Sequence, residues 1–135
     1  MMLVRANRAA EETIDEFLKN NEDIDKKTLL DSGYVVEVNQ RIAGCFSLDP
    51  LGEGRYWLRQ LYITRTEAVK LPMLVETILT LALQKKATKV YVKSHKLMLD
   101  ILLESLQFHP EHDSPLNEKT TDDHGKWWSY QISSP

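Results

Sequence analysis

Three strand patterns between residues 34 and 63, joined by one tight turn and one longer turn, constrain the fold of this chain more than any other feature. The segments YVVEV (34–38) and RIAGCFSL (41–48) flank the dipeptide NQ, and RYWLRQLYI (55–63) follows the turn DPLGEG (49–54). Their β-branched and aromatic residues favour strands. A two-residue turn joins antiparallel neighbours, because parallel strands need a long crossover. The run therefore predicts three consecutive antiparallel strands.

Helix and strand patterns fill most of the remaining chain. Helices are expected at 8–21 with Asn7 as N-cap, at 23–33 with Gly33 as the stop signal, at 72–86 and at 96–106. Further strands are expected at 2–6, at 89–94, after the last helix, and at 125–132, with a polar exposed loop over 110–125. The order β-α-α-β-β-β-α-β-α-β-β predicts a single α/β (α+β) domain over residues 1–135, with a mixed, mostly antiparallel sheet and helices on both faces.

Composition and charge exclude several classes of protein. The formal net charge is −3, whereas non-specific nucleic-acid binding requires a basic surface. A membrane-spanning helix needs about 18 consecutive apolar residues, and no apolar run approaches this length. The first residues lack the apolar core of a signal peptide. We therefore expect a cytoplasmic protein with neither a nucleic-acid nor a membrane partner. The single cysteine, Cys45, lies in the apolar run IAGCFSL, which favours a buried structural thiol over a nucleophile.

Several short segments, taken in this order, resemble the GNAT superfamily of acyl-CoA-dependent N-acetyltransferases over residues 2–132. YVVEVNQRIAGCFSL is similar to the second and third strands of that family, LRQLYI to the fourth and VYVKS to the fifth. ETILTLA is similar to its third helix, and LLESLQF to its helix-to-strand ending. The resemblance implies a coenzyme A cleft where the fourth and fifth strands splay apart. It also implies that the backbone of Leu61, Tyr62 and Ile63 pairs with the pantetheine arm.

The loop that binds the diphosphate of coenzyme A in this family reads Q/R-x-x-G-x-G/A, and the resemblance places it at residues 66–71, TEAVKL. Val69 and Leu71 occupy the two glycine positions, and no glycine lies between Gly54 and Gly125. Glycines matter in such a loop because they let backbone N–H groups approach the phosphates closely. We therefore expect acetyl-CoA binding to be weak or lost.

The flanks of this loop also disfavour an anion. Pro72 lacks an N–H group, and Glu67 adds a negative charge. Thr64-x-x-Glu67 fits a capping box, in which the helix satisfies its own N-terminus. Arg65 and Lys70 could still meet a phosphate, but only as flexible point charges.

The catalytic positions that the resemblance implies are not matched. The tyrosine that often serves as general acid in the family corresponds to Leu103, which cannot protonate a thiolate, and the glycine near it corresponds to Gln107. Arg59 and Gln60 on the fourth strand are not bases, so Glu37 on the neighbouring strand is the nearest carboxylate, with an exposed strand residue as the competing interpretation. His95, after the fifth strand, is the second candidate acid or base, against helix capping or simple exposure.

Two other sets of residues invite a functional interpretation. His109 and His112, with Asp113, Asp122, Asp123 and His124, could supply metal ligands, but Pro110 breaks the helical face that would align the pair. We expect a solvated loop there and no metal site. Trp127 and Trp128 point to opposite faces of a strand, so we expect one in the core and the other exposed, either on a cleft wall or at an interface such as that of a homodimer.

Three functional hypotheses follow from these patterns. The first is a GNAT-fold acetyltransferase-like protein with an eroded coenzyme A loop, weakly active or non-catalytic, that binds a small molecule or a protein partner. The second is an active acetyl-CoA-dependent N-acetyltransferase acting on a small-molecule or protein amine, with Arg65 and Lys70 replacing the glycines. The third is an unrelated α/β interaction module. The loop chemistry favours the first hypothesis, and whether the protein is an enzyme stays open.

Overall fold

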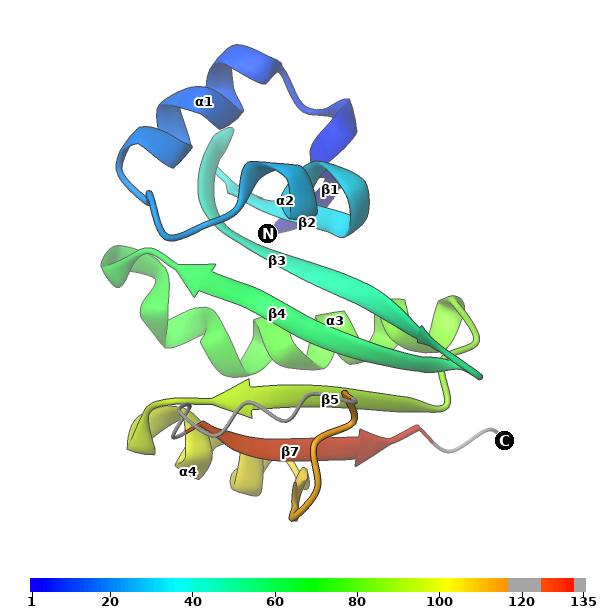
Figure 1. Ribbon diagram of the computed structural model, residues 1–135. Coiled ribbons are helices and arrows are strands. Elements are labelled where there is room, and N and C mark those ends of the chain that lie inside the picture. Colours follow the sequence, from blue (N-terminus) through cyan, green and yellow to red (C-terminus); the bar gives the residue numbers. More distant parts are fainter. Residues whose placement is uncertain (117–124, 133–135) are drawn as a thin grey trace. The chain divides into compact units, whose positions relative to one another are not determined.

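The computed structural model describes residues 1–116 and 125–132 (Figure 1). The elements are, in chain order, β1 (Met2–Arg5), η1 (Ala6–Arg8), α1 (Glu11–Lys19), α2 (Lys26–Ser32), β2 (Gly33–Val38), β3 (Arg41–Gly52), β4 (Arg55–Ile63), η2 (Arg65–Lys70), α3 (Leu71–Gln84), β5 (Lys89–Ser94), α4 (Leu97–Ser105), β6 (His109–Glu111) and β7 (Lys126–Gln131). This order confirms the predicted succession of helices and strands. Pro110 and Glu111, expected in the exposed loop, already belong to β6.

The strands form a mixed, mostly antiparallel sheet in the order β1-β2-β3-β4-β5-β7-β6, with β4 and β5 as parallel neighbours. The chain divides into two compact units. Unit 1 comprises Met1–Asp49 and Leu58–Leu71, and unit 2 comprises Pro50–Trp57 and Pro72–Pro135. No helix in the described part of the chain is long and apolar enough to span a membrane.

Unit 1 is organised around the β2–β3 hairpin. Asn39 and Gln40 both have left-handed backbone conformations, with φ of 52° and 66°, as a type I′ turn requires. β1 pairs with β2 on the other side, and the β2–β3 register shifts once, between Val36 and Glu37. One buried apolar cluster of unit 1 joins η1, the two helices and the hairpin: Ala6, Ile14, Phe17, Leu29, Val35 and Cys45.

Both helices of unit 1 begin later than their sequence patterns suggest. Asn7 is not an N-cap, because it lies inside the turn η1, whose Ala6 is fully buried, and α1 begins only after Ala10 without any side-chain cap. Burial of Ala6 thus overrides the capping preference of Asn7. α2 has a conventional cap, since the Asp25 carboxylate accepts a hydrogen bond from the Thr28 N–H at 3.0 Å.

Gly33 ends α2 as predicted, but in an extended conformation rather than the left-handed one typical of a C-terminal glycine. The reason for glycine here is space. A Cβ atom at this position would lie 2.4 Å from the Leu29 carbonyl oxygen, so only glycine lets the chain turn directly from the helix into β2.

The helices of unit 2 end in left-handed residues that are not glycine. At the end of α4, Gln107 has φ of 72°, its N–H donates to the Glu104 carbonyl at 3.0 Å, and the Phe108 N–H donates to the Leu103 carbonyl at 2.9 Å. These two bonds form a Schellman motif. The carbonyl groups at the helix end are therefore satisfied even though the position lacks its preferred glycine.

Trp127 and Trp128 of β7 point to opposite faces of the strand, as predicted, but both are buried, with 7% and 3% of their surface exposed. Trp127 packs against Trp57 and Tyr91, with ring centroids 5.6 and 6.5 Å apart. Trp128 donates its indole N–H to the Asp100 carboxylate of α4 at 2.8 Å. The prediction of an exposed tryptophan is wrong, because aromatic rings cover one face of β7 and α4 covers the other.

The three outer strands of unit 2 are tied by a polar cluster, Lys89–Glu111–Ser129. Lys89 Nζ lies 2.9 Å from Glu111 Oε1, which also accepts a hydrogen bond from Ser129 Oγ at 2.6 Å. The Ser129 hydroxyl, and then the Lys89 ammonium, lower the pKa of Glu111, while Glu111 raises the pKa of Lys89. The cluster therefore favours the charged forms of both side chains.

This cluster predicts a pH dependence of folding. The lowered pKa of Glu111 contributes stability that is present above its ordinary value of 4.5 and is lost as the pH falls through the folded-state pKa. The raised pKa of Lys89 contributes stability that is present below 10.5 and is lost as the pH rises through the folded-state pKa. We expect Glu111→Gln to flatten the stability profile between about pH 5 and pH 3, measured by urea unfolding at each pH.

Glu104→Gln is the matched control, because Glu104 is exposed on α4 of the same unit. It removes one carboxylate without touching the cluster. If both variants show the same loss of stability with falling pH as the wild type, Glu111 does not carry the effect.

Candidate functional site

The backbone expected to bind a ligand is the end of β4, where Leu61, Tyr62 and Ile63 are consecutive and half-buried. β3 approaches this segment unusually closely at Gly44. A Cβ atom there would lie 2.3 Å from the Tyr62 carbonyl oxygen and 3.2 Å from Ile63 Cα. The Tyr62 ring packs against Phe17 of α1, with centroids 5.8 Å apart. Both the backbone and a side chain of this segment are thus fixed within unit 1.

Gln60, immediately before this segment, breaks the regular geometry of β4. Its φ is 54°, a left-handed conformation within a strand. Its side-chain amide pairs with the backbone of Asp25: Gln60 Oε1 accepts from the Asp25 N–H at 2.6 Å, and Nε2 donates to the Asp25 carbonyl at 3.3 Å. Sequence reasoning missed this role, because glutamine carries no signal for a left-handed strand residue.

The turn after β4 is a 3₁₀ helix, η2, and the predicted capping box at its start is wrong. In a capping box the Glu67 N–H would donate to the Thr64 hydroxyl. Here it donates to the Thr64 carbonyl at 3.0 Å. Thr64 Oγ1 lies 3.3 Å from Thr66 Oγ1, and no side chain caps the turn. The i→i+3 bonds of the 3₁₀ helix take the place of side-chain capping.

The two cations proposed for phosphate binding lie at opposite ends of η2. Arg65 is exposed at the first position. Lys70, at the last, forms an ion pair with Glu67, with Nζ 2.7 Å from Oε2. Val69 between them has 84% of its surface exposed. The turn therefore presents one cation, an internally paired cation and an apolar side chain to its surroundings.

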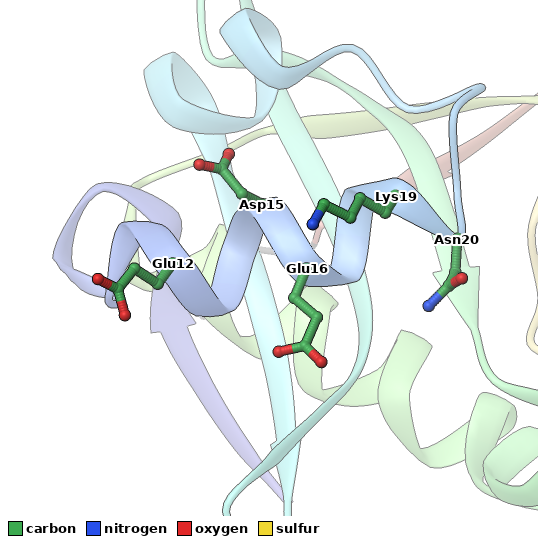
Figure 2. A pocket seen from close by; sticks show the side chains of 5 residues that line it. All are labelled: Glu12, Asp15, Glu16, Lys19 and Asn20. Atoms are coloured by element: carbon green, nitrogen blue, oxygen red, sulfur yellow. The ribbon is translucent and has the colours of Figure 1, made fainter.

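Two surface hollows flank α1. One, of about 390 Å³, is lined by residues 19–24 and by Tyr62 of β4, so that the carboxylates of Glu22 and Asp23 lie beside the candidate segment. The other is drawn in Figure 2, where Glu12, Asp15, Glu16 and Lys19 leave α1 and Asn20 follows its end. Asp15 is already paired with Lys26 of α2 at 2.7 Å. Because four of these five residues are exposed, this hollow is the outer side of one helix rather than an enclosed site.

The two catalytic candidates lie in different units. Glu37 is half-buried on β2, at the register shift, opposite Met2 and Ile42. His95 is exposed after β5, and the N-cap position of α4 is Lys96. Leu103, at the position of the family's tyrosine, is fully buried. Both candidates stay predictions.

Within residues 1–116 and 125–132, no three His, Cys, Asp or Glu side chains come together as metal ligands. Asp122, Asp123 and His124, weighed above as ligands, lie outside the described residues.

Cys45 is buried, as predicted, and burial raises the pKa of its thiol to about 12. Its Sγ lies 3.5 Å from the Gln60 carbonyl, to which the thiol donates. A thiol in this state is not a nucleophile near neutral pH. We expect 5,5′-dithiobis(2-nitrobenzoate) to label Cys45 at pH 8 only after unfolding in urea. Fast labelling of the native protein would show that the thiol is accessible.

Comparison with known proteins places the fold. No protein-family model and no curated protein matches the sequence. Among solved structures, an acetyltransferase of the GNAT family from Staphylococcus aureus Mu50 matches with a TM-score of 0.72 at 15% identity, over 98% of this chain and 99% of that one. Aminoglycoside 6′-acetyltransferase type Ii matches with a TM-score of 0.73 at 13% identity, over the full length of both chains.

A third similar structure is Rv2747 from Mycobacterium tuberculosis, solved in complex with coenzyme A. It matches with a TM-score of 0.73 at 10% identity, over 98% of this chain and 100% of that one. The chain therefore has the GNAT acetyltransferase fold, and an unrelated fold is excluded. At these identities the likeness concerns the fold alone.

Proposed function

We propose that this protein is an acetyltransferase-like binding protein that pairs weakly with the pantetheine arm of an acyl-CoA through the β4 backbone and transfers little or no acetyl group. In this proposal it lacks the cradle that would hold the diphosphate. The single observation that carries the proposal is the chemistry of η2.

A diphosphate needs several backbone N–H groups directed at it from one turn. In η2 the Glu67 N–H donates to the Thr64 carbonyl, and the Leu71 N–H donates to the Ala68 carbonyl, so neither group is directed at a ligand. The Glu67 carboxylate repels an anion and holds Lys70 in an ion pair. Pro72, the next residue, offers no N–H group. These residues do not fit a diphosphate.

The pantetheine arm makes smaller demands, because it offers amide groups that a strand backbone can pair with. The half-buried backbone of Leu61–Ile63 is suited to this role, and the close approach of Gly44 fixes its position. One protein of the same fold was solved with coenzyme A. Carried to this chain, these observations support an acyl-CoA ligand held chiefly by its pantetheine part.

The second candidate function is acetyl transfer to an amine. The hollow beside Tyr62, lined by Glu22 and Asp23, favours it, because carboxylates would attract a protonated amine. Against it stand the buried Leu103 in place of an acid and the ion pair that occupies Lys70.

The test compares acetyl-CoA with S-acetylpantetheine, which lacks the diphosphate and the nucleotide. Titration calorimetry of the wild-type protein should give dissociation constants that agree within about threefold for the two ligands. Acetyl-CoA that binds 100-fold more tightly or more would mean that η2 holds the diphosphate, and release of free coenzyme A thiol with amine acceptors would then support an active acetyltransferase. Binding of neither ligand would overturn the acyl-CoA proposal altogether.

A gain-of-function variant sharpens this test. Val69→Gly with Leu71→Gly restores both glycine positions, and exposed Val69 contributes little to folding. We expect the double variant to bind acetyl-CoA about tenfold more tightly while its affinity for S-acetylpantetheine stays unchanged. Val69→Ala is the control, because it shortens the side chain without freeing the backbone. An equal gain in Val69→Ala would attribute the effect to bulk rather than to backbone freedom.

A further inference from the structure

We infer that Gln60 is a positioning residue, whose side-chain amide sets the direction of the β4 backbone at Leu61–Ile63 by tying it to the start of α2. The inference rests on the proposed function in so far as it concerns ligand binding. All residues involved belong to unit 1.

Gln60 has a left-handed backbone inside a strand, whereas the other left-handed glutamines, Gln40 and Gln107, lie in a turn and at a helix end. Left-handed residues other than glycine are usually asparagine or aspartate in turns, whereas Gln60 lies within a strand with φ of 54°. Such a conformation persists only when the surroundings determine it. Contacts of the Gln60 side chain and peptide must therefore compensate for the strain.

The compensating contacts come from two neighbouring elements. The amide forms the two hydrogen bonds to the Asp25 backbone described above, an exchange of donor and acceptor like that between paired strands. Gln60 Nε2 also lies 3.5 Å from Ser47 Oγ of β3, and the Cys45 thiol donates to the Gln60 carbonyl. The side chain and the peptide group are thus both held.

The hydrogen bonds between Gln60 and Asp25 connect the start of α2 with the strand segment that is expected to bind the ligand. Asp25 is the N-cap of α2, so its own position is set by its hydrogen bonds to Thr28. On the other side, a left-handed residue redirects the strand that follows it, which here is Leu61–Ile63. The direction in which β4 presents its N–H and C=O groups therefore depends on where α2 begins.

The test uses Gln60→Gly and Gln60→Glu. Glycine accepts the left-handed backbone but deletes the amide, whereas glutamate keeps the length and loses the donor to the Asp25 carbonyl. Gln40→Gly is the matched control, because Gln40 has φ of 66° in an exposed turn of the same unit. The readouts are hydrogen exchange at Leu61–Ile63, the urea midpoint, and the affinity for S-acetylpantetheine.

We expect Gln60→Gly to raise amide exchange at Leu61–Ile63 and to weaken S-acetylpantetheine binding, each by about tenfold, with a urea midpoint close to that of the wild type. Gln60→Glu should show a smaller change in the same direction, and Gln40→Gly should show neither effect. Unchanged exchange in Gln60→Gly would overturn the inference, as would a general rise in exchange across unit 1. If the wild-type protein binds no S-acetylpantetheine, the proposed function fails while the exchange data still decide the role of Gln60.

Discussion

Gly44→Ala is expected to lower the free energy of unfolding by about 3 kcal/mol, at the upper end of the usual cost of overpacking. The added Cβ would lie 2.3 Å from the Tyr62 carbonyl oxygen, and no rotamer change can relieve a contact between two backbone-anchored atoms. β3 and β4 must therefore move apart locally. Urea unfolding followed by tryptophan fluorescence measures the loss, and the affinity for S-acetylpantetheine should fall with it.

Gly52→Ala is the control for Gly44→Ala. Gly52 has φ of 93°, and a Cβ atom added to it would meet nothing within 4 Å, so alanine there incurs backbone strain alone, about 1 kcal/mol. A Gly44→Ala variant no less stable than Gly52→Ala would show that the strands are not in close contact at this point.

Trp128→Ala is expected to destabilise the protein by about 3–5 kcal/mol, because it removes the largest side chain between β7 and α4. Trp128→Phe keeps most of the packing and removes the indole N–H, which leaves the Asp100 carboxylate without this donor. The expected loss is then about 1–2 kcal/mol. Urea unfolding and the near-ultraviolet circular dichroism of the tryptophans give both values.

The Trp128 variants also test the corrected view of β7. A Trp128→Lys variant would probe a dimer interface if the ring were exposed, but burial predicts that it unfolds instead. Should Trp128→Lys remain fully folded and change only the oligomeric state, the side chain must be exposed in solution.

Strand positions could be predicted from the sequence where alternation and turn chemistry agree. The bounds of β4, Arg55–Ile63, and of β5, Lys89–Ser94, coincide with their predicted segments. The dipeptide Asn39–Gln40 fixed the hairpin, because the left-handed conformation of both residues suits its twist. Even Gly44 carried a signal, since a glycine inside a strand marks close backbone approach.

Helix starts could not be predicted as well, because several local motifs competed with burial and with backbone bonding. Asn7 has the side chain of an N-cap, yet burial of Ala6 draws the chain into a 3₁₀ turn instead. Thr64 and Glu67 have the spacing of a capping box, but backbone bonds satisfy the turn first. Such outcomes depend on tertiary packing, which a local sequence pattern does not contain.

In the candidate site, too, one part could be predicted from the sequence and another depends on tertiary contacts. The segment Leu61–Ile63 was located by resemblance, and its role in ligand binding stays a prediction. The contacts of Gln60 with Asp25 join residues 35 positions apart. A pairing of this kind has no local periodicity, and the left-handed glutamine that marks it is visible only in three dimensions.

The division of the chain between its two units has a consequence for synthesis on the ribosome. Residues 1–71 contain all of unit 1, while unit 2 takes its earliest piece, residues 50–57, from within that stretch. That piece carries Trp57, whose ring later meets Trp127, and Gly54, whose carbonyl accepts from the Thr88 N–H at 2.7 Å. Translation thus delivers every residue of the first unit early, whereas Trp57 of the second unit meets Trp127 only after about 70 further residues have been made.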